Sequence, residues 1–401
     1  MRIATLLLFC TIGVGATASA QAQSLKPDQV YSSIAVRPIS APNPVQGADG
    51  RIHLAFELVV TNPSNLYITL DRVEATDEQG RSLASMDGER LKSMTKPFSV
   101  NAAPDVVPPG GMAIVFMDVS FAAGDTLPGK VSGRITATRQ VAGPDGKPQR
   151  PPAGFPLPVT FSFTGAETGL GHPALVVEPP LRGDRWVAVN GCCDAITSHR
   201  GAVMAINGRV RVPERFAIDW VRLDQQDRLF TGDGKKLSDY AYYGTPVHAV
   251  AAGTVVNLYN DTDEQVPNSP TKGINTENIG GNMLVIDIGG GNFAFYAHLQ
   301  RDSLKVGLGD RVTAGQVIGL LGNTGNSSAP HLHFHVMDGP SPLDANGLPY
   351  VFTRFVSRGI ADLDAPDDPM EKGTPVRIDA SRLGGSHSNQ LPLNNEVVDF
   401  Q

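Results

Sequence analysis

The sequence predicts an all-β protein with two domains, and three features carry this prediction. Glycine and proline are plentiful, at 43 and 31 of 401 residues, whereas only 6% of the residues are aromatic. Apolar and polar residues alternate over short runs, and turn-forming residues bound these runs, as they bound β-strands. The chain is long enough for two or three separately packed cores. We therefore expect many short strands and few helices.

Residues 1–22 have the pattern of a secretory signal peptide. Arg2 precedes an apolar run at residues 3–14, and small residues at 18–20 follow it. The apolar run is shorter than the roughly 20 residues that span a bilayer. No later stretch of the sequence is apolar enough to cross a membrane. We expect a mature chain without an integral membrane segment, either periplasmic or secreted through a Sec-type signal.

Residues 24–165 are predicted to form an immunoglobulin-like β-sandwich. Alternation is clearest at residues 52–60, and turn chemistry such as Pro-Pro-Gly-Gly at residues 108–111 separates the runs. The strand candidates are residues 52–60, 68–75, 112–121, 130–138 and 155–163. We find no catalytic set of side chains in this part, and His53, a lone histidine in a strand, is expected to be structural.

The rest of the chain divides into three predicted parts. A linker rich in proline and glycine covers residues 166–184, and a second domain of short strands with glycine-rich turns covers residues 185–352. Residues 353–401 are predicted to be a polar tail with one strand near residues 376–378 and mobile last residues.

The net charge of the chain narrows its possible partners. The formal net charge of −7 provides no basic surface, so we do not expect nucleic acid as a partner.

The adjacent Cys192 and Cys193 are expected to be ordinary thiols or a local bridge, because neighbouring cysteines cannot form a framework disulfide with each other.

Three histidines alternate along one predicted strand, at positions 331, 333 and 335. Side chains alternate between the two faces of a strand, so His331, His333 and His335 share one face. Imidazole is a common zinc ligand and a general acid or base near neutral pH. Three imidazoles on one strand face therefore predict a site of metal or proton chemistry.

Other motifs surround this strand in a characteristic order. From residue 217 to residue 336 the chain contains AIDW, GTPVHAVAAGTV, NMLVIDIGGGNFAFYAHL, VGLGDRVTAGQVIG and GNTGNSSAPHLHFHV. From about residue 200 to residue 352, this order resembles the lysostaphin/LytM-type zinc metalloendopeptidase family, whose fold is a duplicated hybrid motif. The resemblance implies a LytM-like β-sheet peptidase domain at residues 185–352, a zinc cofactor, and hydrolysis of peptide bonds in peptidoglycan peptides.

The resemblance also implies roles for four residues. Asp219 and His333 match metal-binding positions of the family. His298 and His331 match its two non-ligand histidines, which handle protons and stabilise the transition state. In the implied reaction zinc polarises the scissile carbonyl and acidifies a water molecule, and one of these histidines assists the attack of that water.

One position departs from the family pattern. Arg215 stands where the family has its first metal-binding histidine, and a guanidinium group has no lone pair for a metal. In an extended segment Arg215 would share a face with Asp219, so we expect that the two could pair. Two histidines could replace the missing ligand: His199, which a hairpin at residues 202–212 would bring back to the site, and His335. We favour His199, because His335 would require the zinc to lie further along the strand.

Two functions follow from this pattern. We expect an active zinc metalloendopeptidase, because Asp219, His298, His331 and His333 all remain suited to the chemistry. The alternative is an inactive LytM-like module that binds cell-wall peptides or activates a partner amidase, because Arg215 replaces a ligand. A carrier module for sugars or phosphate could share the β architecture, but it would not need this group of histidines beside Asp219.

Overall fold

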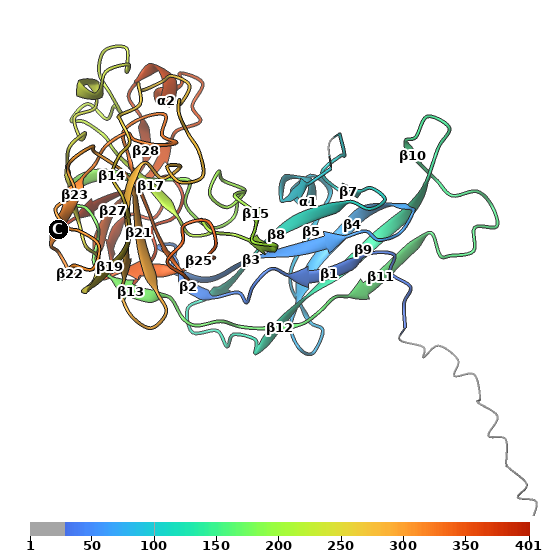
Figure 1. Cartoon of the computed structure of the whole chain (residues 1–401). Coiled ribbons are helices and arrows are strands. Elements are labelled where there is room, and N and C mark those ends of the chain that lie inside the picture. The colour runs from blue at the N-terminus through green and yellow to red at the C-terminus, as the bar shows by residue number, and fades with distance from the viewer. Residues whose placement is uncertain (1–28, 100) are drawn as a thin grey trace, which may run out of the picture. The chain divides into compact units, whose positions relative to one another are not determined.

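The structure is a computed structural model that describes residues 29–99 and 101–401 (Figure 1). The predicted signal peptide at residues 1–22 lies outside the described residues. All the elements below belong to one compact unit, Ser32–Gln401. The prediction of an all-β chain is confirmed, and the helices of the described part are short: α1 (Gly88–Ser93), the 3-10 helix η1 (Leu237–Asp239) and α2 (Pro369–Lys372). None of the helices described is long and apolar enough to cross a membrane.

The N-terminal part consists of two antiparallel sheets that share one hydrophobic core. The first sheet contains β1 (Ala35–Pro38), β3 (Arg51–Thr61), β8 (Met112–Ala122) and β6 (Thr95–Pro97), with β2 (Pro44–Gln46) on β3. The second contains β10 (Pro148–Gln149), β9 (Lys130–Ala142), β4 (Tyr67–Thr76) and β5 (Ser82–Asp87), with β11 (Thr160–Thr164), β12 (Thr168–Gly169) and β7 (Val106–Val107) at its sides. The arrangement is a β-sandwich, and its immunoglobulin-like character stays a prediction.

Strand β3 is buried on both of its faces. Leu54, Phe56 and Leu58 point into the sandwich core, as the alternation in the sequence predicts. Ala55, on the opposite face, belongs to the core of the C-terminal part. Glu57 lies on that same face and is fully buried. One strand therefore contributes side chains to two cores.

The C-terminal part is built on a sheet of twelve strands. In spatial order these are β22 (Arg311–Val312), β19 (Gly253–Tyr259), β20 (Asn282–Asp287), β21 (Phe293–Leu299), β24 (Leu332–Met337), β17 (Ile218–Arg222), β14 (Gly183–Val189), β30 (Glu396–Phe400), β27 (Phe355–Asp362) and β28 (Arg377–Asp379), with β25 (Gly347–Leu348) on β24 and β29 (Gly385–His387) on β27. Three strand pairs complete this part: β15 (Met204–Ile206) with β16 (Arg209–Arg211), β18 (Pro246–His248) with β23 (Val317–Leu320), and β13 (Leu175–Val177) with β26 (Tyr350–Phe352).

The structure differs from the prediction of a polar tail with mobile last residues at 353–401. β30 pairs with β14 and β27, so the end of the chain lies inside the large sheet. Phe400 packs edge-on against Trp220, with ring centroids 5.1 Å apart. The segment predicted as a linker also pairs in part, because β13 runs parallel to β26. Both segments are poor in apolar residues on average, but their few apolar side chains meet cores formed by distant parts of the chain.

Candidate metal and catalytic centre

Two neighbouring strands place Asp219 beside His333. β17 pairs with β24 in a register that sets Asp219 opposite His333. His333 Nδ1 lies 3.0 Å from Oδ1 of Asp219. Both side chains are largely buried, and this contact, with the others described below, offsets the free-energy cost of removing them from water.

A tight hairpin brings His199 to the same carboxylate. β15 and β16 pair through a turn at Asn207 and Gly208, both of which have positive φ, as a two-residue hairpin turn requires. The chain therefore returns alongside itself, and His199 Nε2 lies 3.1 Å from Oδ2 of Asp219. His199 Nδ1 lies 3.0 Å from the carbonyl oxygen of Ala217, which can only accept a hydrogen bond. Nδ1 therefore carries a proton in either charge state of the ring, and Nε2 faces Asp219.

His199, Asp219 and His333 together form a compact group of three possible metal ligands. One nitrogen or oxygen atom from each lies within 4.8 Å of the others. Zinc bonds of about 2.0–2.2 Å at tetrahedral angles separate neighbouring ligand atoms by roughly 3.3 Å. The contacts of 3.1 Å and 3.0 Å to Asp219 are close to that separation, so small shifts would admit an ion.

The other two predicted site histidines lie next to this group. The rings of His298 and His331 are 4.6 Å apart between centroids, and His331 Nε2 lies 3.3 Å from Oδ1 of Asp219. His298 is the second-last residue of β21 and has a φ of 60°, a conformation that costs energy for a residue with a side chain and is frequent at functional sites. Its Nδ1 lies 2.8 Å from the carbonyl oxygen of Thr324. The four histidines at 199, 298, 331 and 333 thus meet around one carboxylate.

His335 lies behind His333 and outside the group of three. Its Nδ1 is 2.9 Å from Nε2 of His333, the nitrogen that points away from Asp219. Its own Nε2 is buried and has no hydrogen-bond partner among the described residues. His335 therefore contacts the outer nitrogen of His333, which is the place of a residue that orients a ligand.

Arg215 does not pair with Asp219, and that sequence expectation is wrong. Its guanidinium group donates to the carboxylate of Glu57 on β3, with distances from Nε and Nη2 to Oε2 of 2.9 Å and 2.6 Å. Both side chains are almost completely buried. A buried guanidinium is stabilised most by a carboxylate that can accept several of its hydrogen bonds, and Glu57 offers this where Asp219 is already surrounded by histidines.

Charges inside the site shift the pKa values in opposite directions. Burial alone would lower the pKa of His199, but the charge and hydrogen bond of Asp219, together with Glu214 and the Ala217 carbonyl, outweigh burial and raise this pKa to about 9. The positive partners, His199 first, hold the pKa of Asp219 well below its usual range although burial opposes them. Burial, followed by the charges of His331 and His333, lowers the pKa of His298 well below its ordinary value. His298 is therefore a neutral imidazole at neutral pH.

The group opens onto a cleft of about 410 Å³. Its lining includes four residues that the sequence analysis did not select: Asn190, Ser198, Glu214 and Asn326. Asn190 donates from Nδ2 to Oδ2 of Asp219 over 2.9 Å, so it contacts the central carboxylate directly. No motif marks Asn190 in the sequence, since its position depends on the pairing of β14 with β17. A larger hollow of about 700 Å³ lies among loop residues 261–278 and has no histidine in its lining, so it is not the site of this chemistry.

The all-β domain thus gathers histidines around one buried carboxylate in a cleft, an arrangement that suits a metal site. Residues 236–345 match peptidase family M23, so the chain contains a domain of that family and the resemblance seen in the sequence is confirmed. The matched range includes His298, His331 and His333. Asp219 and His199 precede it, and the fold alone brings these two residues to the site.

Several known proteins are similar to part of this chain. The chain is 37% identical over 94 residues to the glycyl-glycine endopeptidase ALE-1 of Staphylococcus capitis, covering 23% of this chain and 22% of that protein. It is 34% identical over 102 residues to the peptidoglycan DD-endopeptidase ShyA of Vibrio cholerae, covering 25% and 20%. The chain thus spans about a fifth of the length of these relatives. Among solved structures, the catalytic domain of lysostaphin from Staphylococcus simulans is 24% identical, covers 41% of this chain and 88% of that one, and has a TM-score of 0.22.

Proposed function

We propose that the chain is a zinc metalloendopeptidase that hydrolyses peptide bonds in peptidoglycan. The observation that carries the proposal is the group of His199, Asp219 and His333, whose donor atoms lie within 4.8 Å of one another. Two imidazoles and one carboxylate are a ligand set of catalytic zinc sites, which keep a further position open for water or substrate. His199 supplies the nitrogen that Arg215 cannot, so the departure from the family pattern does not remove the third ligand.

The residues present suit the chemistry that zinc supplies when bound, namely Lewis-acid polarisation of a carbonyl and acidification of a water molecule. His298 has one ring nitrogen on the Thr324 carbonyl, so the other carries a lone pair and can take a proton from the attacking water. His331 has acceptors at both nitrogens, the Ala329 carbonyl oxygen at 2.8 Å and Asp219 at 3.3 Å. It therefore keeps both protons and can donate a hydrogen bond to the oxyanion that develops.

The substrate class and the location are part of this proposal. The named relatives are a glycyl-glycine endopeptidase and a peptidoglycan DD-endopeptidase, and residues 236–345, which match peptidase family M23, include three of the site histidines. The signal-peptide pattern at residues 1–22 supports action outside the cytoplasm, where peptidoglycan lies.

Metal content tests the proposal most directly. Purified mature protein should hold about one zinc per chain, and His199→Ala and His333→Ala should each lose it, as measured by mass spectrometry of the metal. His172→Ala is the matched control, because His172 is an exposed histidine away from the cleft. Release of soluble peptides from purified peptidoglycan should follow the zinc content across the variants. A wild-type protein that takes up no zinc would contradict the proposal and favour the inactive module that binds wall peptides or activates an amidase.

A further inference from the structure

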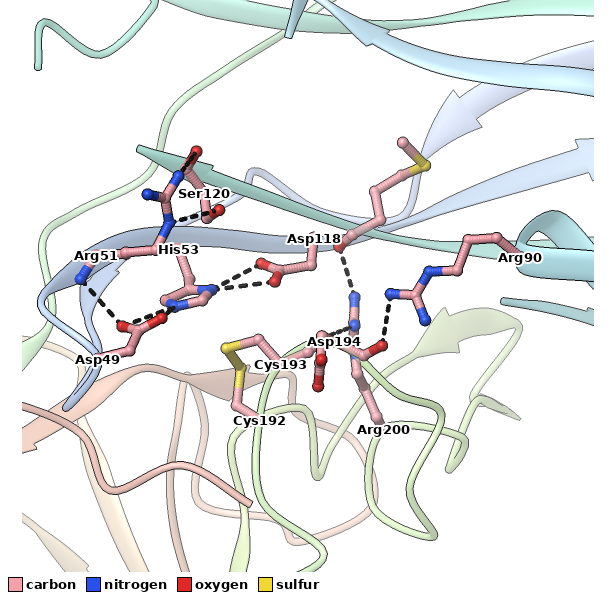
Figure 2. Close-up of polar contacts among 11 residues, drawn as sticks. Asp49, Arg51, His53, Arg90, Asp118, Ser120, Cys192, Cys193, Asp194 and Arg200 are labelled. Atoms are coloured by element: carbon pink, nitrogen blue, oxygen red, sulfur yellow. Dashed lines mark hydrogen bonds and ion pairs between the residues drawn. A yellow bond between two sulfur atoms is a disulfide. The ribbon is translucent and has the colours of Figure 1, made fainter. Parts of the chain in front are cut away.

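A second group of metal-binding side chains lies in the sandwich, apart from the cleft. His53 on β3 stands between two carboxylates, with Nδ1 3.0 Å from Asp118 on β8 and Nε2 3.2 Å from Asp49 (Figure 2). The side chains of His53 and Asp118 are 8% and 9% exposed, whereas that of Asp49 is 24% exposed. Both ring nitrogens of His53 therefore contact a carboxylate, a pairing that the sequence analysis did not predict.

A disulfide between neighbouring residues, Cys192 and Cys193, faces this histidine (Figure 2). The sulfur of Cys193, a ring nitrogen of His53 and a carboxylate oxygen of Asp118 lie within 4.8 Å of one another. Cys193 is buried. A nitrogen, an oxygen and a sulfur from three distant segments thus converge on one point, and the proposed peptidase reaction uses none of them.

Two arginines fix the cysteine segment against the sandwich. Arg200 donates to the carbonyl oxygens of Cys193 and of Met117 on β8, the latter over 2.6 Å. Arg90 donates to the carbonyl oxygen of Asp194 over 2.7 Å. The two arginines thus hold the carbonyl groups of Cys193 and of the next residue, so breaking the bridge would leave Cys193 near His53.

The oxidation state of the bridge decides whether these atoms can bind a metal. A disulfide sulfur carries no negative charge, whereas a thiolate is a strong ligand for zinc and similar ions. Thiolate, imidazole and carboxylate together make a ligand set for zinc. In such a site Asp49, which contacts Nε2, would orient the histidine as an outer carboxylate does. Nδ1 of His53 and the carboxylate of Asp118 would then both coordinate the ion.

We propose that Cys193, His53 and Asp118 form a second site for zinc or a similar transition-metal ion, which opens when the Cys192–Cys193 bridge is reduced. A dithiol donor supplies the two electrons and two protons that break the S–S bond, and it leaves as a disulfide while both cysteines become thiols. Metal binding then releases the proton of the Cys193 thiol to solvent, and the ion replaces the proton between His53 and Asp118.

Cobalt(II) tests the proposal through a readout that the peptidase centre cannot give. A cobalt–thiolate bond absorbs in the near ultraviolet, whereas the ligands His199, Asp219 and His333 include no sulfur. Full-length protein is reduced with a phosphine, the phosphine is removed, and cobalt is added. The charge-transfer band should appear in reduced protein and be absent from oxidised protein. His333→Ala should keep the band, which separates this site from the proposed zinc centre.

Two serine variants sharpen the test because each prevents the bridge. Cys192→Ser leaves Cys193 as a thiol and should show the band without any reductant. Cys193→Ser leaves only Cys192, and no band should appear. His53→Gln, in the reduced state, should weaken cobalt binding at least about tenfold. Equal spectra for the two serine variants, or no band in reduced wild-type protein, would overturn the proposal, and neither result depends on whether His53→Gln folds.

Discussion

At the scale of single residues, the cleft is organised around one carboxylate. The two oxygens of Asp219 contact His199, His331, His333 and the amide of Asn190. The sequence was sufficient to select Asp219 and four of the histidines, because each belongs to a motif or to a predicted hairpin. Asn190 could not be selected, since only strand pairing brings it to the site.

His298 and His331, which lie outside the proposed ligand group, should affect turnover without affecting zinc content. His298→Gln and His331→Gln should each lower the rate of peptidoglycan hydrolysis by about 10²–10⁴-fold, the usual contribution of a general acid or base. Zinc content should stay near one per chain, because neither residue belongs to the three-residue group. The measurement is a paired assay of released peptides and bound metal. Loss of zinc in either variant would assign that histidine to the metal instead.

The buried pair of Arg215 and Glu57 has a separate prediction. Arg215→Met leaves the Glu57 carboxylate buried without its main partner, which should lower the free energy of unfolding by about 3–5 kcal/mol. Replacing both residues, as Arg215→Met with Glu57→Leu, should cost clearly less than the sum of the single changes. Lys130→Met is the control, since Lys130 forms an exposed pair with Glu167 and should change stability by less than about 1 kcal/mol. Urea denaturation gives all four values, and additive costs would contradict this account.

The partner of Arg215 was not predictable from local pattern. Glu57 lies 158 residues earlier in the chain, in a strand whose alternation predicts only which residues enter the sandwich core. The spacing of Arg215 and Asp219 favoured a contact that the fold does not make. The alternation of residues in one strand predicts which face of the strand a side chain lies on. The residue that it contacts depends on which other segment packs against that face.

At the scale of elements, the strands that the sequence predicts best are those whose inward positions are mostly filled by apolar residues. β3 and β9 contain the predicted runs at residues 52–60 and 130–138. β27 alternates between buried and half-exposed residues just as regularly, but Ser357 and Gly359 occupy inward positions. The apolar signal is therefore missing, and the segment at 353–401 was taken for a tail.

Phe400 should be a main anchor of the C-terminal strand. Its ring packs edge-on against both Trp220 and Phe352 and is almost fully buried. Phe400→Ala should lower the free energy of unfolding by about 3–5 kcal/mol, through lost burial and the cavity that remains. Phe98→Ala, at a ring that is 43% exposed, should cost much less. If both variants unfold at the same urea concentration as wild type, the C-terminal strand does not anchor to the core in this way.

Glu396, at the start of the same strand, should make stability depend on pH. Burial raises the pKa of Glu396 to about 7, and hydrogen bonds from Ser357 and Leu393 oppose this only in part. An unfolded glutamate titrates near 4.5, so the folded protein holds the proton more tightly. The unfolding free energy should therefore fall as pH rises from about 4.5 to 7, by up to about 3 kcal/mol from this residue.

Glu396→Gln should remove that dependence, because the amide does not titrate. The difference in stability between variant and wild type should grow in favour of the variant across the same pH window. Urea denaturation at several pH values between 4 and 8 measures it. A constant difference would mean that Glu396 has similar pKa values in the folded and unfolded states.

At the scale of the whole molecule, the sequence indicated two parts with separate roles, and the two largest hydrophobic clusters of the described residues correspond broadly to these parts. However, each cluster includes residues from the other side of the predicted domain boundary. Ala55 of the sandwich belongs to the C-terminal core, whereas Val203 and Val212 near the site belong to the sandwich core. Composition along the chain cannot reveal which residues pack into the other part's core, because this depends on which surfaces of the folded parts contact each other.

The two buried faces of β3 have a consequence for how the chain could be divided or recombined. Because β3 contributes side chains to both hydrophobic cores, removing either part of the chain would expose one buried face of this strand. Residues 185–401 by themselves would keep Arg200 and Arg215 but lose Glu57, exposing two guanidinium groups and an apolar surface where β3 had been. Transferring residues 185–401 to another protein would therefore require transferring the sandwich with them.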